Sequence, residues 1–285
     1  MRSVRIQVKL ALPALSRRLS DAGCGVQRLD DTWLVVSGGE EQLLSVLHAF
    51  ILSDWQYEYI QHRLSLTHPE LTEEQREYIS LLTVHRLRGP QILADHKFAA
   101  AGQFSLPSEQ FASQLRASLA ELVAGEVLHV EGLVRFRGRR YLQVLQTAME
   151  EMVEQVLTDQ EYEEFVAMLR YILDVQQPSR QRLHVFCADE RVWICDDDGQ
   201  LVRDQEVSSA AAQACPGEDV NGEDLAMSIL ITRSPEQIVI HDLSTRAPWP
   251  SFAETVERVF LERSLRCGDC PTCRRLRENG EIAPM

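Results

Sequence analysis

The most informative feature of the sequence is a change in the spacing of its apolar residues at Pro178. From Glu41 to this proline, apolar side chains recur mainly every three or four residues, which is typical of helices. Beyond it they alternate in short runs, as in β-strands. The pattern predicts a predominantly helical α+β protein with an N-terminal β-α-β piece, a central helical region and a small C-terminal α/β module.

The helical spacing is most regular in two consecutive runs that precede Pro178. Thr158 and Glu161 separate these runs in the pattern of a capping box, which marks the start of a new helix. We therefore expect an αα-hairpin of two antiparallel helices. The apolar residues of the two runs are Leu142, Leu145, Met149, Met152 and Val156, then Tyr162, Phe165, Leu169 and Ile172.

The N-terminal piece begins with alternation over residues 4–8, which predicts a strand. Pro13 suits the first turn of a following helix, which Gly23 and Gly25 would end. A second strand is predicted at residues 32–37. Further helices are expected at 41–64, 72–88, 92–101 and 108–124, with a capping box at Thr72 and Gln75 and a linker at 102–107.

The C-terminal module alternates hairpin and helix signals. Residues 183–187 and 191–195 predict a hairpin, and Asp196 to Gly199 the next turn. The same acidic run does not fit an EF-hand calcium loop, because its twelfth position would be Gln205. A helix that begins at Asn221 or Asp224 and runs to about Arg233, a strand at 237–241 and a helix capped by Ser251 and Glu254 complete the module.

Length and charge limit the function classes. A chain of 285 residues is long for one core, and its patterns divide it into regions 1–106, 107–179 and 180–285. The formal net charge of -14 disfavours non-specific binding to nucleic acid or anionic membranes.

The sequence predicts a cytoplasmic protein. Lys9 and Pro13 interrupt the apolar N-terminal run, so no signal peptide is expected. The longest uncharged apolar stretch, near 43–53, is shorter than the roughly 20 residues that span a bilayer. The chain has seven cysteines, an odd number that favours free thiols or a metal site over disulfides in a reducing compartment.

Three cysteines form the sharpest local feature, a Cys-Gly-Asp-Cys-Pro-Thr-Cys run at Cys267, Cys270 and Cys273. Two-residue gaps let thiolates converge around a tight turn, and Zn²⁺ binds four nitrogen or sulfur ligands. His241 is a candidate fourth ligand, as are three further cysteines, and flanking arginines would lower the thiol pKa. The alternatives are an iron-sulfur cluster or three reduced thiols without metal. These further cysteines are Cys187, Cys195 and Cys215, and the arginines are Arg263, Arg266, Arg274 and Arg275.

The densest basic run consists of Arg135, Arg137, Arg139 and Arg140, and Arg86 with Arg88 forms a smaller one. This run is a candidate anion or nucleic-acid patch. The structural alternative, which the acidic net charge favours, is pairing with the glutamates of the predicted hairpin. Those glutamates are Glu150, Glu151, Glu154, Glu161, Glu163 and Glu164.

No contiguous catalytic motif is present in the sequence. It contains no phosphate-binding glycine loop, nucleophile elbow, His-Glu-x-x-His or dinucleotide fingerprint. We therefore expect a protein that is not an enzyme. A non-contiguous active site remains an alternative, and it would bring together distant groups such as Glu131, Arg135 and His184.

The order of residues between 129 and 186 carries a family resemblance. Residues 129–141 read His-Val-Glu-Gly-Leu-Val-Arg-Phe-Arg-Gly-Arg-Arg-Tyr, and residues 161–178 run from Glu-Tyr-Glu-Glu-Phe to Gln-Gln-Pro. This resembles the YtxC-type sporulation proteins, in which Glu-Gly-Phe-x-x-Phe-Arg precedes a Glu-Tyr-x-Glu-Phe helix and a Gln-x-Pro exit. The likeness runs from about residue 120 to the cysteine-rich end, with departures at Leu133 and Gly138.

The resemblance implies a role in sporulation and no catalytic residue, because that family is characterised by process rather than by chemistry. The leading hypothesis is a non-enzymatic cytosolic scaffold that binds another protein, with Zn²⁺ as its candidate cofactor. Nucleic-acid binding through the arginine run and an unrecognised enzyme are the alternatives.

Overall fold

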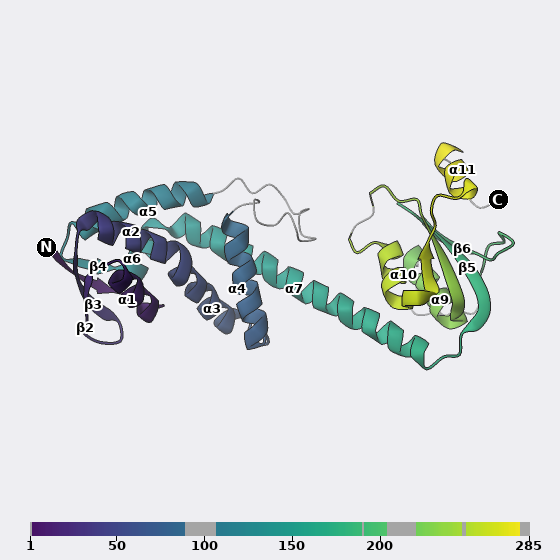
Figure 1. Ribbon diagram of the computed structural model, residues 1–285, viewed down its shortest axis with the longest axis horizontal. Coiled ribbons are helices and arrows are strands. Elements are labelled where there is room, and N and C mark those ends of the chain that lie inside the picture. The colour runs from purple at the N-terminus through teal and green to yellow at the C-terminus, as the bar shows by residue number, and fades with distance from the viewer. Residues whose placement is uncertain (1, 89–106, 190, 204–220, 247–248, 280–285) are drawn as a thin grey trace. The chain divides into compact units, whose positions relative to one another are not determined.

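The computed structural model describes residues 2–88, 107–189, 191–203, 221–246 and 249–279 (Figure 1). Contacts between Cα atoms divide the chain into two units, Met1–Thr158 and Asp159–Met285. Each unit combines helices with a small sheet, and helices predominate, which confirms the predicted α+β class. The division lies inside the predicted central region 107–179, and the three-region scheme stays a prediction.

The sheet of the N-terminal unit has the described strand order β2-β3-β1-β4. The predicted opening strand, helix and strand are present, but β3 runs antiparallel to β1 because an additional strand, β2, forms a hairpin with β3. The sequence of β2 gave no signal because Val26 is its only large apolar residue. Short β4 pairs parallel with β1. The elements are β1 (Arg2–Gln7), α1 (Leu12–Asp21), β2 (Gly25–Arg28), β3 (Trp33–Gly38) and β4 (Val127–His129).

Helices cover this sheet and build the larger core. The predicted helix 41–64 is present but contains a π-helical segment, η1, between α2 and α3. The capping box of α4 is confirmed, because the Thr72 N–H donates to Gln75 and the Gln75 N–H donates to Thr72 Oγ1. The helix predicted at 92–101 lies outside the described residues. The bounds are α2 (Glu40–Phe50), η1 (Ile51–Trp55), α3 (Gln56–Thr67), α4 (Glu73–Arg88), α5 (Pro107–Val123) and α6 (Val130–Arg137).

The predicted αα-hairpin is wrong, because one helix, α7 (Arg139–Asp174), replaces it. Neither glycine nor proline interrupts the segment around Thr158, and threonine costs a helix interior only a few tenths of a kcal/mol, about 0.5. The two apolar runs face two different cores. Leu145 and Met149 pack in the N-terminal unit, whereas Val166 and Leu169 pack in the C-terminal unit.

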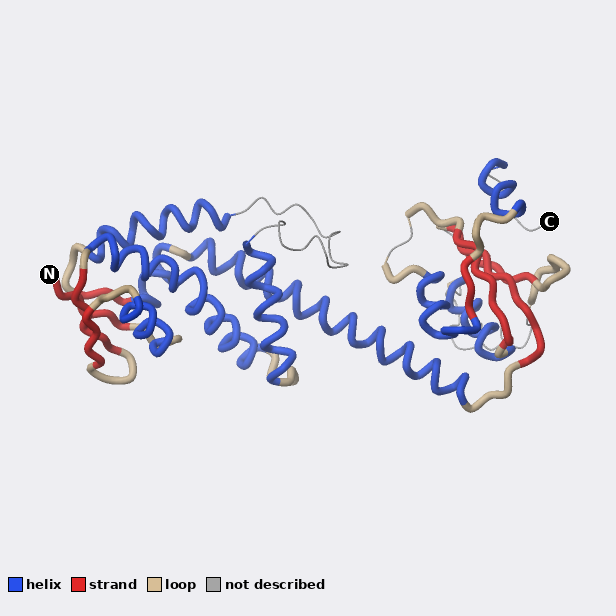
Figure 2. The backbone as a smooth tube through the Cα atoms, viewed as in Figure 1, coloured by secondary structure: helices blue, strands red, loops and turns tan. Residues whose placement is uncertain are grey.

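The C-terminal unit contains a four-stranded sheet of described order β6-β5-β7-β8 (Figure 2). The predicted hairpin is confirmed as antiparallel β5 and β6, and the turn after it closes as Gly199 N–H donates to the Asp196 carbonyl. Helices α9 and α10 connect the parallel strands β5, β7 and β8. The bounds are β5 (Ser179–Ala188), β6 (Arg191–Cys195), α9 (Gly222–Arg233), β7 (Pro235–Asp242), α10 (Phe252–Phe260), η3 (Leu261–Arg263), β8 (Ser264–Arg266) and α11 (Pro271–Asn279).

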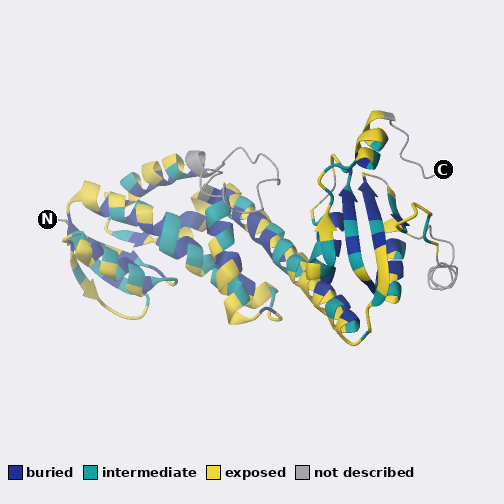
Figure 3. Cartoon of the chain, turned by 45° about the vertical axis from the view of Figure 1, so that its right-hand side comes forward, coloured by how far each residue is buried: buried dark blue, intermediate teal, exposed yellow. Residues whose placement is uncertain are grey.

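The two faces of this sheet bury different clusters. Val185 and Ile240 belong to the main core, which α7, α9 and α10 cover. Because side chains alternate along a strand, their neighbours Phe186 and His241 project from the opposite face. Phe186 there joins a smaller cluster that includes Cys273. Buried residues accordingly follow the central strands (Figure 3).

No helix in the described parts of the chain combines the length and the apolar character that crossing a membrane requires.

Candidate metal centre

Four potential ligands converge on the second face of the C-terminal sheet: His241, Cys267, Cys270 and Cys273. One ligand atom from each residue lies within 4.8 Å of all the others. The Nδ1 atom of His241 is 3.2 Å from the Cys273 sulfur and 3.7 Å from the Cys270 sulfur. The Cys273 sulfur is 3.6 Å from that of Cys270 and 3.9 Å from that of Cys267.

These separations match a tetrahedral zinc site. With Zn–S bonds of about 2.3 Å and Zn–N bonds of about 2.0 Å, sulfurs lie about 3.8 Å apart and nitrogen lies about 3.5 Å from sulfur. The four sulfur–sulfur and nitrogen–sulfur distances given above, between 3.2 and 3.9 Å, bracket these values. The four donors therefore fit one Zn²⁺ ion and would occupy all four of its coordination positions.

The sheet and a short helix place the four ligands. His241 lies on β7 and is 4% exposed. Cys267 directly follows β8, and its N–H donates to the Ile240 carbonyl at 2.8 Å, so the strand pairing continues into the cluster. Cys270 immediately precedes α11 and Cys273 lies in its first turn, where the positive end of the helix dipole favours thiolates.

The turn between Cys267 and Cys270 depends on an aspartate rather than on the glycine beside it. The residue with left-handed backbone geometry is Asp269, with φ of 70°, and not Gly268. Aspartate tolerates this conformation better than most residues. Its carboxylate also accepts hydrogen bonds from Arg274 and Arg277 at 3.2 and 3.1 Å, so it ties the turn to α11.

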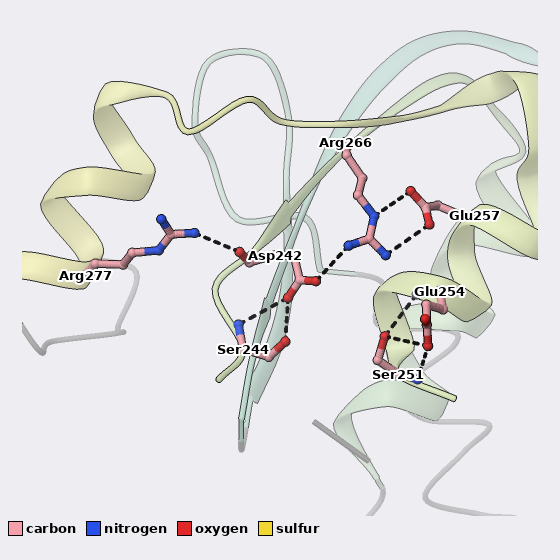
Figure 4. Close-up of polar contacts among 7 residues, drawn as sticks. All are labelled: Asp242, Ser244, Ser251, Glu254, Glu257, Arg266 and Arg277. Carbon is pink, nitrogen blue, oxygen red and sulfur yellow. Dashed lines mark hydrogen bonds and ion pairs between the residues drawn. The ribbon is translucent and has the colours of Figure 1, made fainter. Parts of the chain in front are cut away.

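Arginine side chains tie the cysteine segment to the sheet (Figure 4). Arg266 donates to both carboxylate oxygens of Glu257 and to Asp242 Oδ2. Arg277 donates to the Asp242 carbonyl at 3.1 Å. Since Asp242 adjoins His241, both contacts fix the cysteine segment relative to the histidine. The expected effect of arginines on the thiols is indirect, because Arg266 and Arg274 pair with carboxylates.

Burial and neighbouring groups set the protonation of the ligands. Burial, followed by repulsion from His184, lowers the pKa of His241 to about 4, so its imidazole is neutral near pH 7. Burial also raises the pKa of Cys273 to about 12. Burial acts in the same direction on Cys270, but hydrogen bonds from Cys273 outweigh it and lower that pKa. A neutral imidazole beside a readily formed thiolate suits metal binding.

Aromatic side chains cover the His241 side of the cluster. The Phe186 ring stacks on His241 with centroids 4.2 Å apart and planes 9° apart, and Trp193 stacks on Phe186 at 5.1 Å. Leu243 and Cys195 belong to the same small cluster. Such a shell limits access of water to a metal site.

Of the candidate fourth ligands in the described parts of the chain, His241 is the one whose ligand atom lies with the three cysteine sulfurs. Cys187 pairs with Asp242 in the β5–β7 register, so its side chain projects from the face opposite to His241. Cys195 lies on the same face as the cluster, but its sulfur is not part of the converging group found among the described residues. Cys215 lies outside the described residues.

The predicted arginine patch spans the end of α6 and the start of α7. Arg137 pairs with Glu121 of α5 at 3.8 Å and not with the glutamates of α7. Arg135, Arg139 and Arg140 form no ion pair with a described residue. The expected pairing occurs for Arg86, which pairs with Glu151. Glu163 pairs instead with Arg258, which belongs to neither basic run. Within the described residues, Arg135, Arg139 and Arg140 thus have no carboxylate partner, and Phe136 between them is 89% exposed.

The residues considered for a non-contiguous active site have structural partners. Glu131 Oε1 accepts hydrogen bonds from the N–H groups of Lys9 and Leu10 and from Trp55 Nε1. His184 lies in the other unit, within hydrogen-bond distance of His241 and Asp197. Glu131 and His184 each form hydrogen-bond contacts with their own neighbours. These contacts remove the reason for grouping the two residues as a catalytic set.

A surface pocket in the N-terminal unit contains a carboxylate that is already paired. Its volume is about 430 Å³, and Arg17, Asp54 and His85 contribute to its lining. Asp54 pairs with Arg18 at 2.5 Å and accepts a hydrogen bond from Ser53. These contacts give its carboxylate a structural role.

A protein-family model described as YtxC-like family matches residues 41–264. The match begins well before residue 120, where the resemblance read from the sequence became clear. It includes His241 and ends before Cys267. Comparisons with curated proteins and with solved structures find no match.

Proposed function

The chain belongs to the YtxC-like family, and from this premise we propose that it is a non-enzymatic sporulation factor whose C-terminal unit is stabilised by a structural zinc ion. The role in sporulation follows from the family resemblance. The convergence of His241, Cys267, Cys270 and Cys273 is the observation that carries the zinc site. It is proposed to act in the cytoplasm by binding another protein.

The ligand set favours a structural over a catalytic ion. Catalytic zinc sites keep one position for water or substrate, whereas structural sites use four protein ligands. All four positions here are filled by the chain, and the aromatic cover of Phe186 and Trp193 limits solvent access. Four donor atoms within 4.8 Å of one another are close enough to bind a single ion.

The ion would attach α11 to the sheet. The apolar attachment of this helix is small, because Cys273 is its most buried residue and Leu276 is only partly buried. Since site formation requires the folded chain, the free energy of metal binding contributes to folding of this segment.

Metal analysis of the purified protein tests the proposal. We expect about one zinc per chain, lost in Cys270→Ser and Cys273→Ser. Cys24→Ala, which removes a buried thiol of the N-terminal unit, is the matched control and should retain the metal. Absence of metal in the unaltered chain, together with a melting temperature that a chelator does not change, would contradict the zinc site.

An exposed apolar stripe on α7 supports protein binding. Phe165, Met168 and Tyr171 on α7 and Val175 directly after its end recur every three or four residues, and they are 42%, 52%, 70% and 69% exposed. Met168 and Tyr171 lie on the side of the helix away from Val166, which enters the core. Contiguous apolar surface of this kind marks interaction sites in soluble proteins.

The charges at this stripe specify the partner. Exposed Glu161 and Glu164 lie one turn before Phe165 and Met168 on the same side of the helix. The proposed partner is therefore a protein that presents an apolar surface flanked by basic side chains.

Site-specific crosslinking tests this surface. A photo-crosslinking residue at Met168 is expected to trap a partner in sporulating cells, and Glu161→Lys with Glu164→Lys should reduce that yield. The control position is Ala167, which is also exposed on α7 but lies outside the stripe. Equal yields at the two positions, or no effect of the charge reversals, would contradict the proposed surface.

Nucleic-acid binding is the second candidate function, because Phe136 is 89% exposed between Arg135 and Arg137. Bases stack on exposed aromatic rings while arginines neutralise phosphates. A titration with single-stranded nucleic acid at increasing salt decides, since such binding must weaken with salt. Arg139→Ala with Arg140→Ala should reduce it and Arg180→Ala should not. No binding at low salt would exclude this function.

A further inference from the structure

His184 lies beside His241 across the parallel pair of β5 and β7. Its Nδ1 atom is 2.9 Å from Nε2 of His241, and the two rings stack with centroids 5.2 Å apart. On its other side, Nε2 of His184 is 3.1 Å from Oδ1 of Asp197. A continuous series of polar contacts thus connects the turn after β6 with the proposed metal ligand.

The direction of these hydrogen bonds follows from the chemistry of the two ends. The Nδ1 atom of His241 faces the cysteine sulfurs, so a metal-bound neutral ring carries its proton on Nε2. That N–H can donate only to a nitrogen lone pair on His184 Nδ1. The proton of His184 then lies on its own Nε2 and is donated to Asp197, whose carboxylate accepts.

The same proton arrangement suits the cluster before and after metal binding. A protonated Cys273 thiol can donate to His241 Nδ1 at 3.2 Å, which again leaves the ring proton on Nε2. When a metal ion binds, it replaces the hydrogen bond from the Cys273 thiol to His241 Nδ1. The proton of the His241 ring stays on Nε2, so the tautomer does not change. His241 is 4% exposed, so water cannot replace His184 as the acceptor without rearrangement.

From this geometry we infer that His184 and Asp197 are positioning residues that fix the tautomer and orientation of His241 for metal binding. The inference rests on the proposed zinc site and adds two residues that do not touch the ion. Hydrogen bonds from ligand imidazoles to outer partners are general in metal sites, and their loss weakens metal affinity by about 10- to 100-fold.

The tautomers of the unaltered, zinc-loaded chain give the first test. Nitrogen NMR of ¹⁵N-histidine-labelled protein should show His184 and His241 both protonated at Nε2, with His241 Nδ1 bound to metal. A His184 proton on Nδ1, or two protons on its ring, would overturn the inference. This measurement uses no substitution and is independent of how any variant folds.

Metal affinity gives the second test. His184→Leu should weaken zinc binding, measured by competition with a chromophoric chelator, by about 10- to 100-fold. His184→Asn should retain more affinity, because its amide oxygen can occupy the position of Nδ1. Asp197→Ala should cause a smaller loss, and Asp198→Ala, in the same exposed turn, is the control. Affinity in His184→Leu equal to that of the unaltered chain would overturn the inference.

Cobalt substitution separates an orienting role from general damage. With Co²⁺ bound, the His184 variants should retain the absorption of three thiolate ligands, while the bands that report coordination geometry shift. An unshifted cobalt spectrum in His184→Leu would count against the inference. If the unaltered chain binds neither zinc nor cobalt, the proposed zinc site itself fails. If the unaltered chain binds both metals and His184→Leu binds them equally well, only the positioning role of His184 fails.

Discussion

Arg266 donates two parallel hydrogen bonds to the Glu257 carboxylate, with N–O distances of 2.6 and 3.0 Å. The paired geometry uses the planar guanidinium in a way that lysine cannot reproduce. It joins α10 to the end of β8, one residue before Cys267. The ion pair thus supports the metal centre without contacting it.

We expect Arg266→Ala to reduce the free energy of unfolding by about 1 kcal/mol, a modest value because the pair is partly exposed. Arg266→Lys should recover part of the loss, since one of the two bonds can form. Arg274→Ala, which removes a more exposed pairing with Asp269, should have little effect. Denaturant unfolding measures all three, and equal losses in Arg266→Ala and Arg274→Ala would contradict the special role of Arg266.

Removal of zinc should loosen α11 before it affects the sheet. Hydrogen exchange after chelation is expected to accelerate at the amides of α11 and at Cys267, whose N–H donates to Ile240. Amides shared by β5 and β7 should keep most of their protection, because their pairing does not depend on the cysteines. Uniform acceleration throughout the C-terminal unit would instead show that the ion supports the whole unit.

Alkaline pH should destabilise the C-terminal unit through Cys187. Burial raises the pKa of this thiol from its usual value of 9.0 to about 12. Between these values the unfolded chain releases the proton while the folded chain retains it, so stability is complete below pH 9 and falls as pH rises. Cys187→Ala should lower the stability at neutral pH but flatten its decline above pH 9. An unchanged slope of unfolding free energy against pH would contradict this assignment.

The continuity of α7 can be tested at Thr158. Replacement of a threonine N-cap by alanine costs about 1 kcal/mol, whereas the same change inside a helix is neutral or slightly favourable. We therefore expect Thr158→Ala to leave the free energy of unfolding unchanged or raise it slightly. Ser251→Ala is the matched comparison, because Ser251 caps α10 in a complete capping box, and it should lose about 1 kcal/mol. A comparable loss at Thr158 would favour two helices.

Gly138 is required by packing between α6 and α7. A Cβ atom there would lie 2.6 Å from the Val134 carbonyl oxygen and 2.8 Å from the Phe111 ring. Gly138→Ala should therefore destabilise the protein by about 1–3 kcal/mol. Gly132→Ala is the control, because its nearest contact would be 3.4 Å and alanine favours a helix. Thermal unfolding measures the stability of both variants. Unchanged stability in Gly138→Ala would show that Phe111 can move aside.

Local sequence signals predicted much of the fold. Capping boxes at Thr72 and Ser251 mark true helix starts, because the side chains that cap a helix lie within four residues of each other. The change of period at Pro178 correctly located β5. The strands β2, β4 and β8 were missed, because three or four residues carry too little alternation. The hairpin error at Thr158 arose because a capping pattern can also occur inside a helix.

Only the ligands of the candidate site that lie close together in the sequence could be predicted. The spacing of Cys267, Cys270 and Cys273 indicates a shared centre, because the three residues lie in one turn. His241 could not be chosen from four candidates without the register that pairs it with Phe186. The contact of His184 with His241 spans 57 residues, and no spacing rule in the sequence reports such a pairing.

The position of the ligands along the chain also determines when the site can be completed. A polypeptide is synthesised from its N-terminus, so β5, β7 and His241 leave the ribosome before any of the three cysteines. Only after α11 has emerged can an ion find all four donors. Capture of the proposed zinc ion by all four ligands therefore has to follow the synthesis of Cys273.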